Sequence, residues 1–234
     1  MKAIILAGGL GTRISEETGD KPKPMVLLDE KPIIWHVMEI YARQGVTDFV
    51  IATGYFGHII HSWVDELDSP WNITALDTGK DTLTGGRIRQ CLEFVGPERT
   101  FATYGDGLGN VNLKKLLEFH INQGRSATVT AVRPPARFGL LESSNGQVIS
   151  FTEKNQVHAG WINGGFFVLE PNVKDYITED MEPFESGALP RMVAAANLSA
   201  YHHDDFWQPM DTLREKQELA KYASAANPPW LIGI

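Results

Sequence analysis

A glycine-rich run near the N-terminus contains the first residues that could bind a phosphate. It reads GGLGTR at positions 8–13 and follows a short apolar stretch that ends at Ala7. Glycines let backbone N–H groups approach an anion, and the guanidinium of Arg13 adds a planar cation. Two familiar phosphate motifs do not match: Ile14 stands where the dinucleotide pattern G-x-G-x-x-G needs its third glycine, and this loop lacks the P-loop pattern. A tight turn with a surface arginine is the alternative.

Lys23 is a second candidate cation, held between Pro22 and Pro24. Proline restricts its own φ and the conformation of the residue before it, so we expect a long extended loop here rather than a helix. A stiffened backbone suits a lysine that must place a point charge beside a phosphate. The alternative is a solvated lysine in a proline-rich loop, and the glycine-rich run just upstream weighs against it.

Two aspartates could hold a divalent metal ion. Asp106 lies between two glycines directly after the apolar stretch Thr100–Tyr104, and Asp211 follows Trp207–Met210. Mg²⁺ prefers one or two carboxylates together with phosphate oxygens and water. Both aspartates also have ordinary structural interpretations, because Asp-Gly is a common turn and Asp211 could cap a helix that begins at Leu213.

These candidates need strands that end at one edge of a sheet, and the hydrophobic pattern predicts such strands. The predicted strands are Lys2–Ala7, Phe49–Thr53, Ile73–Leu76, Phe101–Tyr104 and Ala127–Val132. The helices predicted between them are Ile34–Tyr41, Phe56–Leu67, Arg87–Val95 and Leu113–Gln123. This alternation predicts right-handed βαβ units in a Rossmann-like, mostly parallel twisted sheet with helices on both faces. Ligands of such sheets bind beyond the carboxyl ends of the strands.

The pattern changes after Pro135. We expect a small β-hairpin over Leu140–Thr152, then a strand over Ile162–Glu170, further helices, and an exposed tail over Pro228–Ile234. The sequence contains no internal repeat. We therefore expect one domain over residues 1–234, in which residues 1–135 form a nucleotide-binding half and residues 136–234 form a substrate-binding half on the same sheet.

Composition narrows the function classes. The chain has 234 residues, of which 43% are hydrophobic and 21% charged, as expected for one large globular domain. Its formal charge of −8 disfavours a general nucleic-acid-binding surface. A single cysteine, Cys91, excludes an internal disulfide and a multi-cysteine metal site. Neither a signal peptide nor a long apolar run is present, so we expect a cytoplasmic protein without a membrane partner.

Taken together, the motifs resemble those of the sugar-1-phosphate nucleotidyltransferases. The similarity begins with the run at 8–13 followed by KPKPM at 21–25. Later stretches are similar to the glucose-1-phosphate cytidylyltransferase branch: SEET at 15–18, DTG at 77–79 with LTGGR at 83–87, TYGDG at 103–107, INGGFFVL at 162–169 and FWQPMDT at 206–212. The resemblance covers nearly the whole chain, to about Lys216.

The resemblance implies a role for each matching residue. Arg13 would hold the leaving pyrophosphate, and Lys23 would contact the phosphates near the reacting phosphorus. Asp106 and Asp211 would carry Mg²⁺, which makes these four the expected catalytic residues. The nucleotide would further contact Leu6, Gly8, Gly9, Gly11, Thr12, Thr53, Gly54, Gly85, Gly86, Tyr104 and Gly105.

The resemblance places the sugar phosphate in the second half of the chain. Its expected contacts are Gly139, Glu153, Lys154, Asn163, Gly164 and Gly165. The Glu153 carboxylate would accept hydrogen bonds from sugar hydroxyls, and the Lys154 ammonium would face the sugar phosphate. From the residues alone, this pair could equally be a solvated ion pair at a strand end.

Two features depart from the family's pattern. Asn155 follows the Glu-Lys pair where proline is usual, so the sugar-side loop is expected to be looser. Only residues 68 and 69 separate Leu67 from Pro70, where the cytidylyltransferase branch has a longer segment. That segment helps to cover the nucleotide in relatives, partly across a subunit interface. Subunit assembly and closure over the nucleotide are therefore open at this point.

The implied reaction converts CTP and α-D-glucose 1-phosphate to CDP-glucose and pyrophosphate with Mg²⁺ as the cofactor. A sugar-phosphate oxygen attacks the α-phosphorus of the nucleotide. Two unit charges 4 Å apart repel by about 4 kcal/mol at an effective dielectric constant of 20, and several such pairs meet in this reaction. The attacking oxygen is already charged and needs no general base, so catalysis is mainly positioning and charge neutralisation.

Other functions stay open. The same chemistry could use dTTP, UTP or a modified hexose 1-phosphate. Selection of cytosine needs only a hydrogen-bond acceptor for its N4 amino group, which the backbone near 53–55 or 83–86 could supply. A glycosyltransferase would favour a D-x-D pair, which Asp106-Gly107-Leu108 lacks. A non-catalytic regulatory homologue would have lost some of the four catalytic residues. We expect a homo-oligomer, because the apolar tail Trp230–Ile234 would suit an interface.

Overall fold

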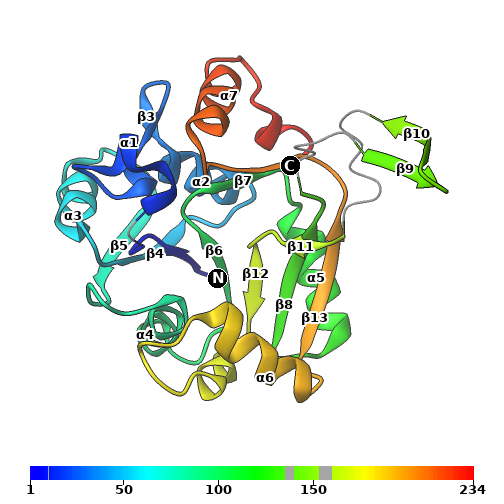
Figure 1. The fold of residues 1–234 in the computed structure, drawn as a ribbon. Coiled ribbons are helices and arrows are strands. Elements are labelled where there is room, and N and C mark those ends of the chain that lie inside the picture. The colour runs from blue at the N-terminus through cyan, green and yellow to red at the C-terminus, as the bar shows by residue number, and fades with distance from the viewer. Residues whose placement is uncertain (10, 135–139, 153–159) are drawn as a thin grey trace.

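The computed structural model describes residues 1–9, 11–134, 140–152 and 160–234. Within these ranges the main sheet has eight strands, in the order β11-β8-β12-β6-β1-β4-β5, with β13 also paired to β8 (Figure 1). The strands are β1 (Ala3–Leu6), β4 (Asp48–Thr53), β5 (Asn72–Asp77), β6 (Thr100–Tyr104), β8 (Ala127–Val132), β11 (Ile162–Asn163), β12 (Phe167–Leu169) and β13 (Leu198–His203).

Most strand pairs in this sheet are parallel. β1 pairs in parallel with β4 and β6, β4 pairs with β5, and β13 pairs with β8, whereas β11 and β12 run antiparallel to their neighbours. The predicted Rossmann-like, mostly parallel sheet is confirmed.

Helices cover both faces of the sheet, because successive residues of a strand point to opposite sides. In β1, Ala3 and Ile5 belong to one buried cluster, and Ile4 and Leu6 belong to a second. The first cluster receives α2 (Ile33–Ala42), α3 (Gly57–Glu66), α5 (Leu113–Gln123) and α7 (Leu213–Ala223), and the second receives α4 (Thr84–Val95) and α6 (Leu189–Ala194). Among the described residues no helix is both long and apolar enough to cross a bilayer.

The remaining elements are short. Three two-stranded ladders join β2 (Leu27–Leu28) to β3 (Lys31–Pro32), β7 (Gly107–Gly109) to β14 (Trp207–Pro209), and β9 (Leu140–Ser144) to β10 (Gln147–Thr152). The short helical segments are η1 (Thr12–Ile14), α1 (Ser15–Thr18), η2 (Lys23–Met25), η3 (Pro171–Tyr176), the π-turn η4 (Phe184–Ala188) and η5 (Pro229–Leu231). The predicted hairpin over residues 140–152 is therefore confirmed.

Three local predictions need correction. The segment after the glycine-rich run contains the short turns η1, α1 and η2 rather than only extended chain. The single strand expected over Ile162–Glu170 is two strands, because Gly165 and Phe166 have positive φ and interrupt the pairing along β8. The C-terminal tail is not simply exposed: the side chain of Trp230 is fully buried against the core.

The strand order locates the ligand-binding edge. The chain runs from β1 outward to β4 and β5, then returns to place β6 on the other side of β1. This reversal creates a crevice between the carboxyl ends of β1 and β6, where open α/β sheets bind their ligands. The loop that begins at Ala7 and the turn at Gly105-Asp106 lie at that crevice.

Candidate functional site

A cavity of about 650 Å³ opens at the carboxyl ends of β1 and β6. Its volume lies within the usual range for small-ligand sites. The residues that line it come from the glycine-rich run, the lysine turn, the start of α4, the end of β6 and the η4 region: Leu6, Ala7, Gly8, Gly9, Gly11, Thr12, Lys23, Pro24, Lys80, Asp81, Thr82, Leu83, Thr84, Arg87, Tyr104, Asp106, Met181 and Glu185.

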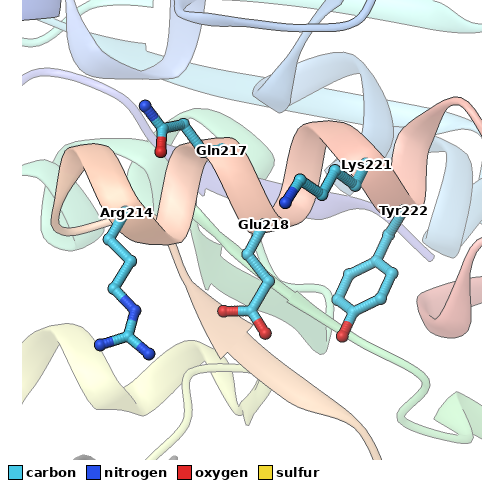
Figure 2. A pocket seen from close by; sticks show the side chains of 5 residues that line it. All are labelled: Arg214, Gln217, Glu218, Lys221 and Tyr222. Atoms are coloured by element: carbon cyan, nitrogen blue, oxygen red, sulfur yellow. The ribbon is translucent and has the colours of Figure 1, made fainter.

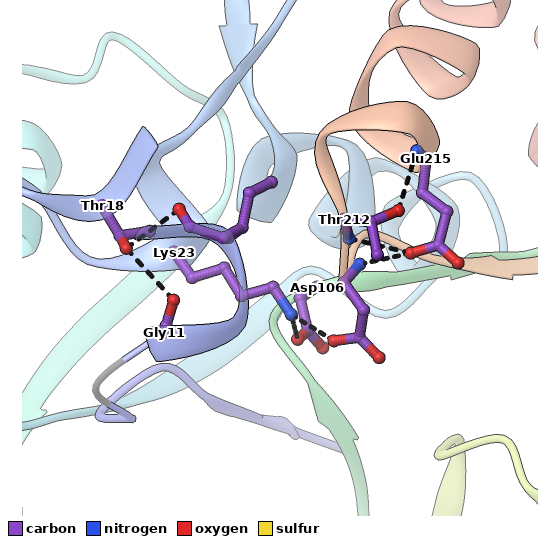
Figure 3. Close-up of polar contacts among 8 residues, drawn as sticks. Gly11, Thr18, Lys23, Asp106, Thr212 and Glu215 are labelled. Carbon is purple, nitrogen blue, oxygen red and sulfur yellow. Dashed lines mark hydrogen bonds and ion pairs between the residues drawn. The ribbon is translucent and has the colours of Figure 1, made fainter. Parts of the chain in front are cut away.

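Three predicted catalytic residues meet at the edge of this cavity. The Nζ atom of Lys23 lies 2.6 Å from Oδ2 of Asp106 and 2.6 Å from Oδ1 of Asp211 (Figure 3). The Lys23 side chain is only 8% exposed, while the two carboxylates are 26% and 18% exposed. Two acidic side chains and one ammonium therefore share a single, largely desolvated position.

A ladder between distant segments brings the two aspartates together. Asp106 immediately precedes β7, and Asp211 comes two residues after β14. Pro209 pairs with Gly107 in this ladder, and the Met210 N–H donates to the Asp106 carbonyl at 2.9 Å. Residues separated by more than a hundred positions thus lie side by side.

The start of α7 holds Asp211 in place. The N–H groups of Asp211 and Thr212 both donate to Oε2 of Glu215, at 2.8 and 2.9 Å, and the Glu215 N–H donates to Oγ1 of Thr212 (Figure 3). This reciprocal arrangement is a capping box, and Glu215 is buried within it. The helix cap that was an alternative role for Asp211 thus belongs to Thr212.

The loop that carries Lys23 folds back on the glycine-rich run. The Thr18 hydroxyl donates to the carbonyls of Gly11 and Ile14, each at 3.1 Å (Figure 3). Gly11 has a φ of 65°, and a Cβ there would lie 3.2 Å from Cβ of Lys23. Gly11 therefore allows both the left-handed turn and the close approach of the lysine. Arg13 belongs to η1 in this loop, and its side chain lies outside the described part of the structure.

Arg87 lies buried beneath the ends of β1, β4 and β5. Its guanidinium donates to the carbonyls of Gly8, Thr53, Gly79 and Lys80 and to the Thr78 hydroxyl, at 2.5 to 3.4 Å. Burial lowers the pKa of Arg87, although an arginine stays protonated at neutral pH. One cation therefore ties three consecutive strand ends together.

Arg87 explains two of the glycines in the predicted nucleotide site. A Cβ at Gly8 or Gly54 would collide with the guanidinium, whereas a Cβ at Gly9 would meet nothing within 4 Å. Gly8 and Gly54 are thus required by packing, and Gly9 keeps an open face toward the cavity. The sequence identified Arg87 only as part of a motif, because no local pattern marks an arginine that will be buried and donate to backbone carbonyls.

A second polar network runs along the cavity from Thr84 at the start of α4 to Asn163 in β11. The carboxylate of Glu185 accepts from the hydroxyls of Tyr104 and Thr84 at 2.6 and 2.7 Å, and the Asn163 amide donates to the Tyr104 oxygen at 2.9 Å. Burial and the nearby Glu185 charge raise the pKa of Tyr104, so its hydroxyl stays protonated and donates. Glu185 was not predicted from the sequence, since it lies far along the chain in the π-turn η4.

Other predicted nucleotide contacts lie next to the cavity rather than in its lining. Thr53 and Gly54 contact Arg87: the Thr53 carbonyl accepts from its guanidinium, and an added Cβ at Gly54 would lie against the same group. Gly85 and Gly86 face the chain at 180–182: an added Cβ would lie 2.6 Å from the Glu182 carbonyl or 2.5 Å from the Asp180 carbonyl. The Gly105 N–H donates to the Leu6 carbonyl at 3.0 Å, which joins the ends of β6 and β1.

The predicted sugar-phosphate contacts fall into two groups. Asn163, Gly164 and Gly165 lie alongside β8 in the sheet. The N–H of Gly164 donates to the Thr130 carbonyl, and the Trp207 indole donates to the Gly164 carbonyl. Asn163 donates a hydrogen bond to Tyr104, which lines the main cavity. Gly139, Glu153 and Lys154 lie outside the described residues, so their predicted roles stay predictions.

A second hollow of about 360 Å³ follows one face of α7 (Figure 2). It is lined by Arg214, Gln217, Glu218, Lys221 and Tyr222, none of which is a predicted site residue. The larger cavity therefore remains the candidate site. The described residues contain no group of three or more His, Cys, Asp or Glu side chains that could hold a metal ion by themselves.

Comparison with known proteins agrees with this arrangement. The family model for nucleotidyl transferases matches residues 2–214. A glucose-1-phosphate cytidylyltransferase from Salmonella typhi is 43% identical over 253 aligned positions, covering 98% of each chain. The mannose-1-phosphate guanyltransferase beta-A of Xenopus laevis is 30% identical, over 99% of this chain and 68% of its own length. The solved structure of HddC from Yersinia pseudotuberculosis superposes with a TM-score of 0.75 at 24% identity, covering 94% of this chain and 98% of that one, which shows a shared fold.

With a family model that spans most of the chain and close relatives that match over their full length, this chain belongs to the nucleotidyl transferase family.

Proposed function

We propose that this protein is a glucose-1-phosphate cytidylyltransferase, which forms CDP-glucose and pyrophosphate from CTP and α-D-glucose 1-phosphate. The observation that carries the proposal is the 43% identity, across 98% of both chains, to an enzyme of that name. The guanyltransferase relative, which is named for a different base and sugar, is only 30% identical. The charged side chains of Lys23, Asp106 and Asp211, which meet at the edge of the cavity, support the proposal.

The glycine-rich run would receive the nucleotide phosphates. Gly9, Gly11 and Thr12 line the cavity at the carboxyl end of β1, and backbone N–H groups of such loops bind anions. Lys23 lies at the same edge, where its ammonium can offset charge that develops on the transferring phosphoryl group. Arg13 in the same loop would hold the departing pyrophosphate.

The two aspartates fit a divalent cation. Their oxygens already surround one cation, the Lys23 ammonium, and two carboxylates plus phosphate oxygens and water suit Mg²⁺. Asp106 and Asp211 would hold the ion. When bound, it would neutralise phosphate charge and orient the α-phosphate for in-line attack. The β7–β14 ladder and the α7 cap keep both carboxylates in position without the ion.

Selection of cytosine requires an acceptor for its N4 amino group. The Thr53 carbonyl already accepts from Thr78 and Arg87, and the Gly54 carbonyl accepts from the Gly57 N–H. The strand-end carbonyls at 53 and 54 are therefore engaged within the protein. We infer that the base meets the wall formed by residues 80–84 and Glu185 instead.

A substrate panel tests the proposed function. Pyrophosphate release is measured with α-D-glucose 1-phosphate and Mg²⁺ in the presence of CTP, UTP, dTTP, ATP or GTP. We expect the largest kcat/KM with CTP. Preference for another nucleotide would replace CTP as the proposed substrate while keeping the reaction class.

The metal assignment has its own test. We expect EDTA to abolish pyrophosphate release, and we expect Asp106→Asn and Asp211→Asn to raise the Mg²⁺ concentration needed for half-maximal activity by at least about tenfold, since each removes one carboxylate ligand. Asp20→Asn is the matched control, because Asp20 is exposed and pairs with the neighbouring Lys21 at 3.7 Å. An unchanged Mg²⁺ titration in either site variant would remove that aspartate from the metal site.

A further inference from the structure

The ammonium of Lys23 lies between the two carboxylates of the site. Its Nζ atom lies at the same distance, 2.6 Å, from an oxygen of each aspartate. Small distances and low exposure mean that no water layer separates these charges. A divalent cation that bridges these same two oxygens would use the space that this ammonium fills.

Lysine is the movable member of this cluster. Both aspartates are held through backbone hydrogen bonds, from Met210 to Asp106 and from Asp211 to Glu215. The backbone of Lys23 is also held, since Met25 donates to Pro22 and Val26 donates to Lys23 in the turn η2. The flexible four-carbon stem of the lysine can still swing its ammonium to another partner.

Charge decides where the ammonium goes. The ammonium makes an ion pair with each carboxylate at 2.6 Å, so the pair holds the lysine firmly. A divalent cation on the same oxygens would repel the ammonium at short range, and within a partly desolvated site that repulsion is strong. A triphosphate in the adjacent cavity offers the ammonium new anionic oxygens.

We propose that Lys23 and the divalent cation exclude each other on the Asp106–Asp211 pair, and that the nucleotide relieves this competition by taking the ammonium onto its phosphates. The inference rests on the proposed function, because it requires a phosphate ligand in the cavity. Its consequence is cooperative binding: the cation binds weakly to the free protein and tightly with the nucleotide, and Lys23 carries this coupling.

The test uses Mn²⁺ as the probe and measures free Mn²⁺ by electron paramagnetic resonance without nucleotide. Lys23→Gln removes the competing charge, and we expect it to bind Mn²⁺ at least about tenfold more tightly than the wild type. Lys23→Arg keeps a cation and should bind as weakly as the wild type. Lys21→Gln is the matched control. Lys21 is a neighbouring lysine whose described ion pair is with Asp20.

A second measurement adds the nucleotide. Proton relaxation enhancement reports Mn²⁺ affinity in the presence of α,β-methylene CTP, which cannot transfer its nucleotidyl group. In the wild type we expect the analogue to raise Mn²⁺ affinity strongly, and in Lys23→Gln we expect most of that increase to be lost. The wild-type measurement needs no variant, so it stands even if Lys23→Gln folds poorly.

Specific outcomes overturn the proposal. Equal or weaker Mn²⁺ binding by Lys23→Gln without nucleotide contradicts the competition, and additive binding of Mn²⁺ and analogue in the wild type contradicts the coupling. Tighter Mn²⁺ binding that survives Asp106→Asn in the Lys23→Gln background places the ion elsewhere. None of these titrations needs turnover, so an inactive protein in the substrate panel would refute the proposed function separately.

Discussion

At the scale of single residues, the glycines predicted to contact the nucleotide serve two different purposes. Gly54 accommodates the Arg87 guanidinium, which would lie 2.5 Å from an added Cβ, and Gly8 lies against the same group. Gly9 has open space in the direction of a side chain. Glycines that look equivalent in the sequence therefore have different physical roles: Gly8 and Gly54 make room for Arg87, and Gly9 leaves open space at the cavity.

This distinction predicts opposite effects of two alanine substitutions. Gly54→Ala should lower the free energy of unfolding by about 1–3 kcal/mol, because the methyl group overpacks against Arg87. Gly9→Ala should leave that free energy nearly unchanged but weaken nucleotide binding, since its methyl group would project into the cavity. Urea unfolding and calorimetric titration with the CTP analogue measure the two effects.

A double variant provides the control. In an Arg87→Ala background, Gly54→Ala should cost less than it does alone, since the clashing group is gone. An equal loss of unfolding free energy in the two backgrounds would show that Arg87 is not the reason for a glycine at position 54. Arg89→Ala is a suitable comparison, because Arg89 lies on the same helix and pairs with Asp180 at 2.6 Å.

At the scale of elements, the site depends on how α7 begins. Glu215 accepts from the N–H groups of Asp211 and Thr212, so the capping box also orients a predicted metal ligand. Glu215→Ala should lower the free energy of unfolding by about 1 kcal/mol, as the loss of a helix cap does. It should also raise the Mg²⁺ concentration needed for half-maximal activity, as Asp211→Asn should.

Glutamine separates the two contributions of this cap. Glu215→Gln keeps an acceptor for both N–H groups, as glutamine does in natural capping boxes, and should retain most of the stability. Thermal unfolding and an Mg²⁺ titration of activity measure the two properties. A fully stable Glu215→Ala variant with an unchanged Mg²⁺ titration would contradict this role of the helix start.

The contact of α5 with the sheet contains a pH-sensitive histidine. His120 lies with Nδ1 2.8 Å from the Thr128 hydroxyl and Nε2 3.1 Å from Glu170, which also binds Arg99. Burial lowers the pKa of His120 in the folded protein. The unfolded chain therefore takes up the proton first, and folding is favoured by the neutral ring.

The sign of the pH effect follows. The stabilisation from neutral His120 is fully present above the unfolded pKa of about 6.5 and is lost as the pH falls below it and through the folded pKa. Urea unfolding at pH 5 to 8 should show declining stability toward pH 5, and His120→Gln should flatten the decline. Burial also lowers the pKa of His36, so part of the slope should remain. Identical slopes in both proteins would contradict the assignment.

At the scale of the whole molecule, the C-terminal tail closes the core. Trp230 is fully buried, and the centre of its ring lies 5.5 Å from that of His36. The Asn110 amide donates to the Ile232 carbonyl. The tail thus packs against α2 and the β7 region. The homo-oligomer expected from this apolar tail stays a prediction, which sedimentation of the intact protein would test.

Trp230→Ala should therefore act on the fold. Loss of a fully buried tryptophan costs about 3–5 kcal/mol, so we expect a large drop in the urea midpoint. Ile232→Ser is the control, because that side chain is 55% exposed and should matter little for the stability of one subunit. Comparable losses in the two variants, or none in Trp230→Ala, would contradict the packing of the tail.

Much of the fold was predictable because its signals are local. The helical stripe of Leu113–Gln123 ends at a left-handed glycine, Gly124, and an Asn112 side chain caps its start, so both ends were readable from neighbouring residues. Strand β8 was likewise predicted with its observed bounds. The split of Ile162–Glu170 was not predictable in this way, since Thr130 of a different strand holds the interruption.

The candidate site divides in the same manner. By itself, the sequence determined the alternating elements, the glycine-rich run at the end of the first strand and the residue types able to offset phosphate charge, because these follow from spacing and side-chain chemistry. Only the tertiary structure decided that Lys23 binds Asp106 and Asp211, that Arg87 requires Gly8 and Gly54, and that Glu185 reaches Tyr104. Those contacts join segments far apart in the chain, and their hydrogen bonds exist only where packing has excluded water and brought the partners within about 3 Å.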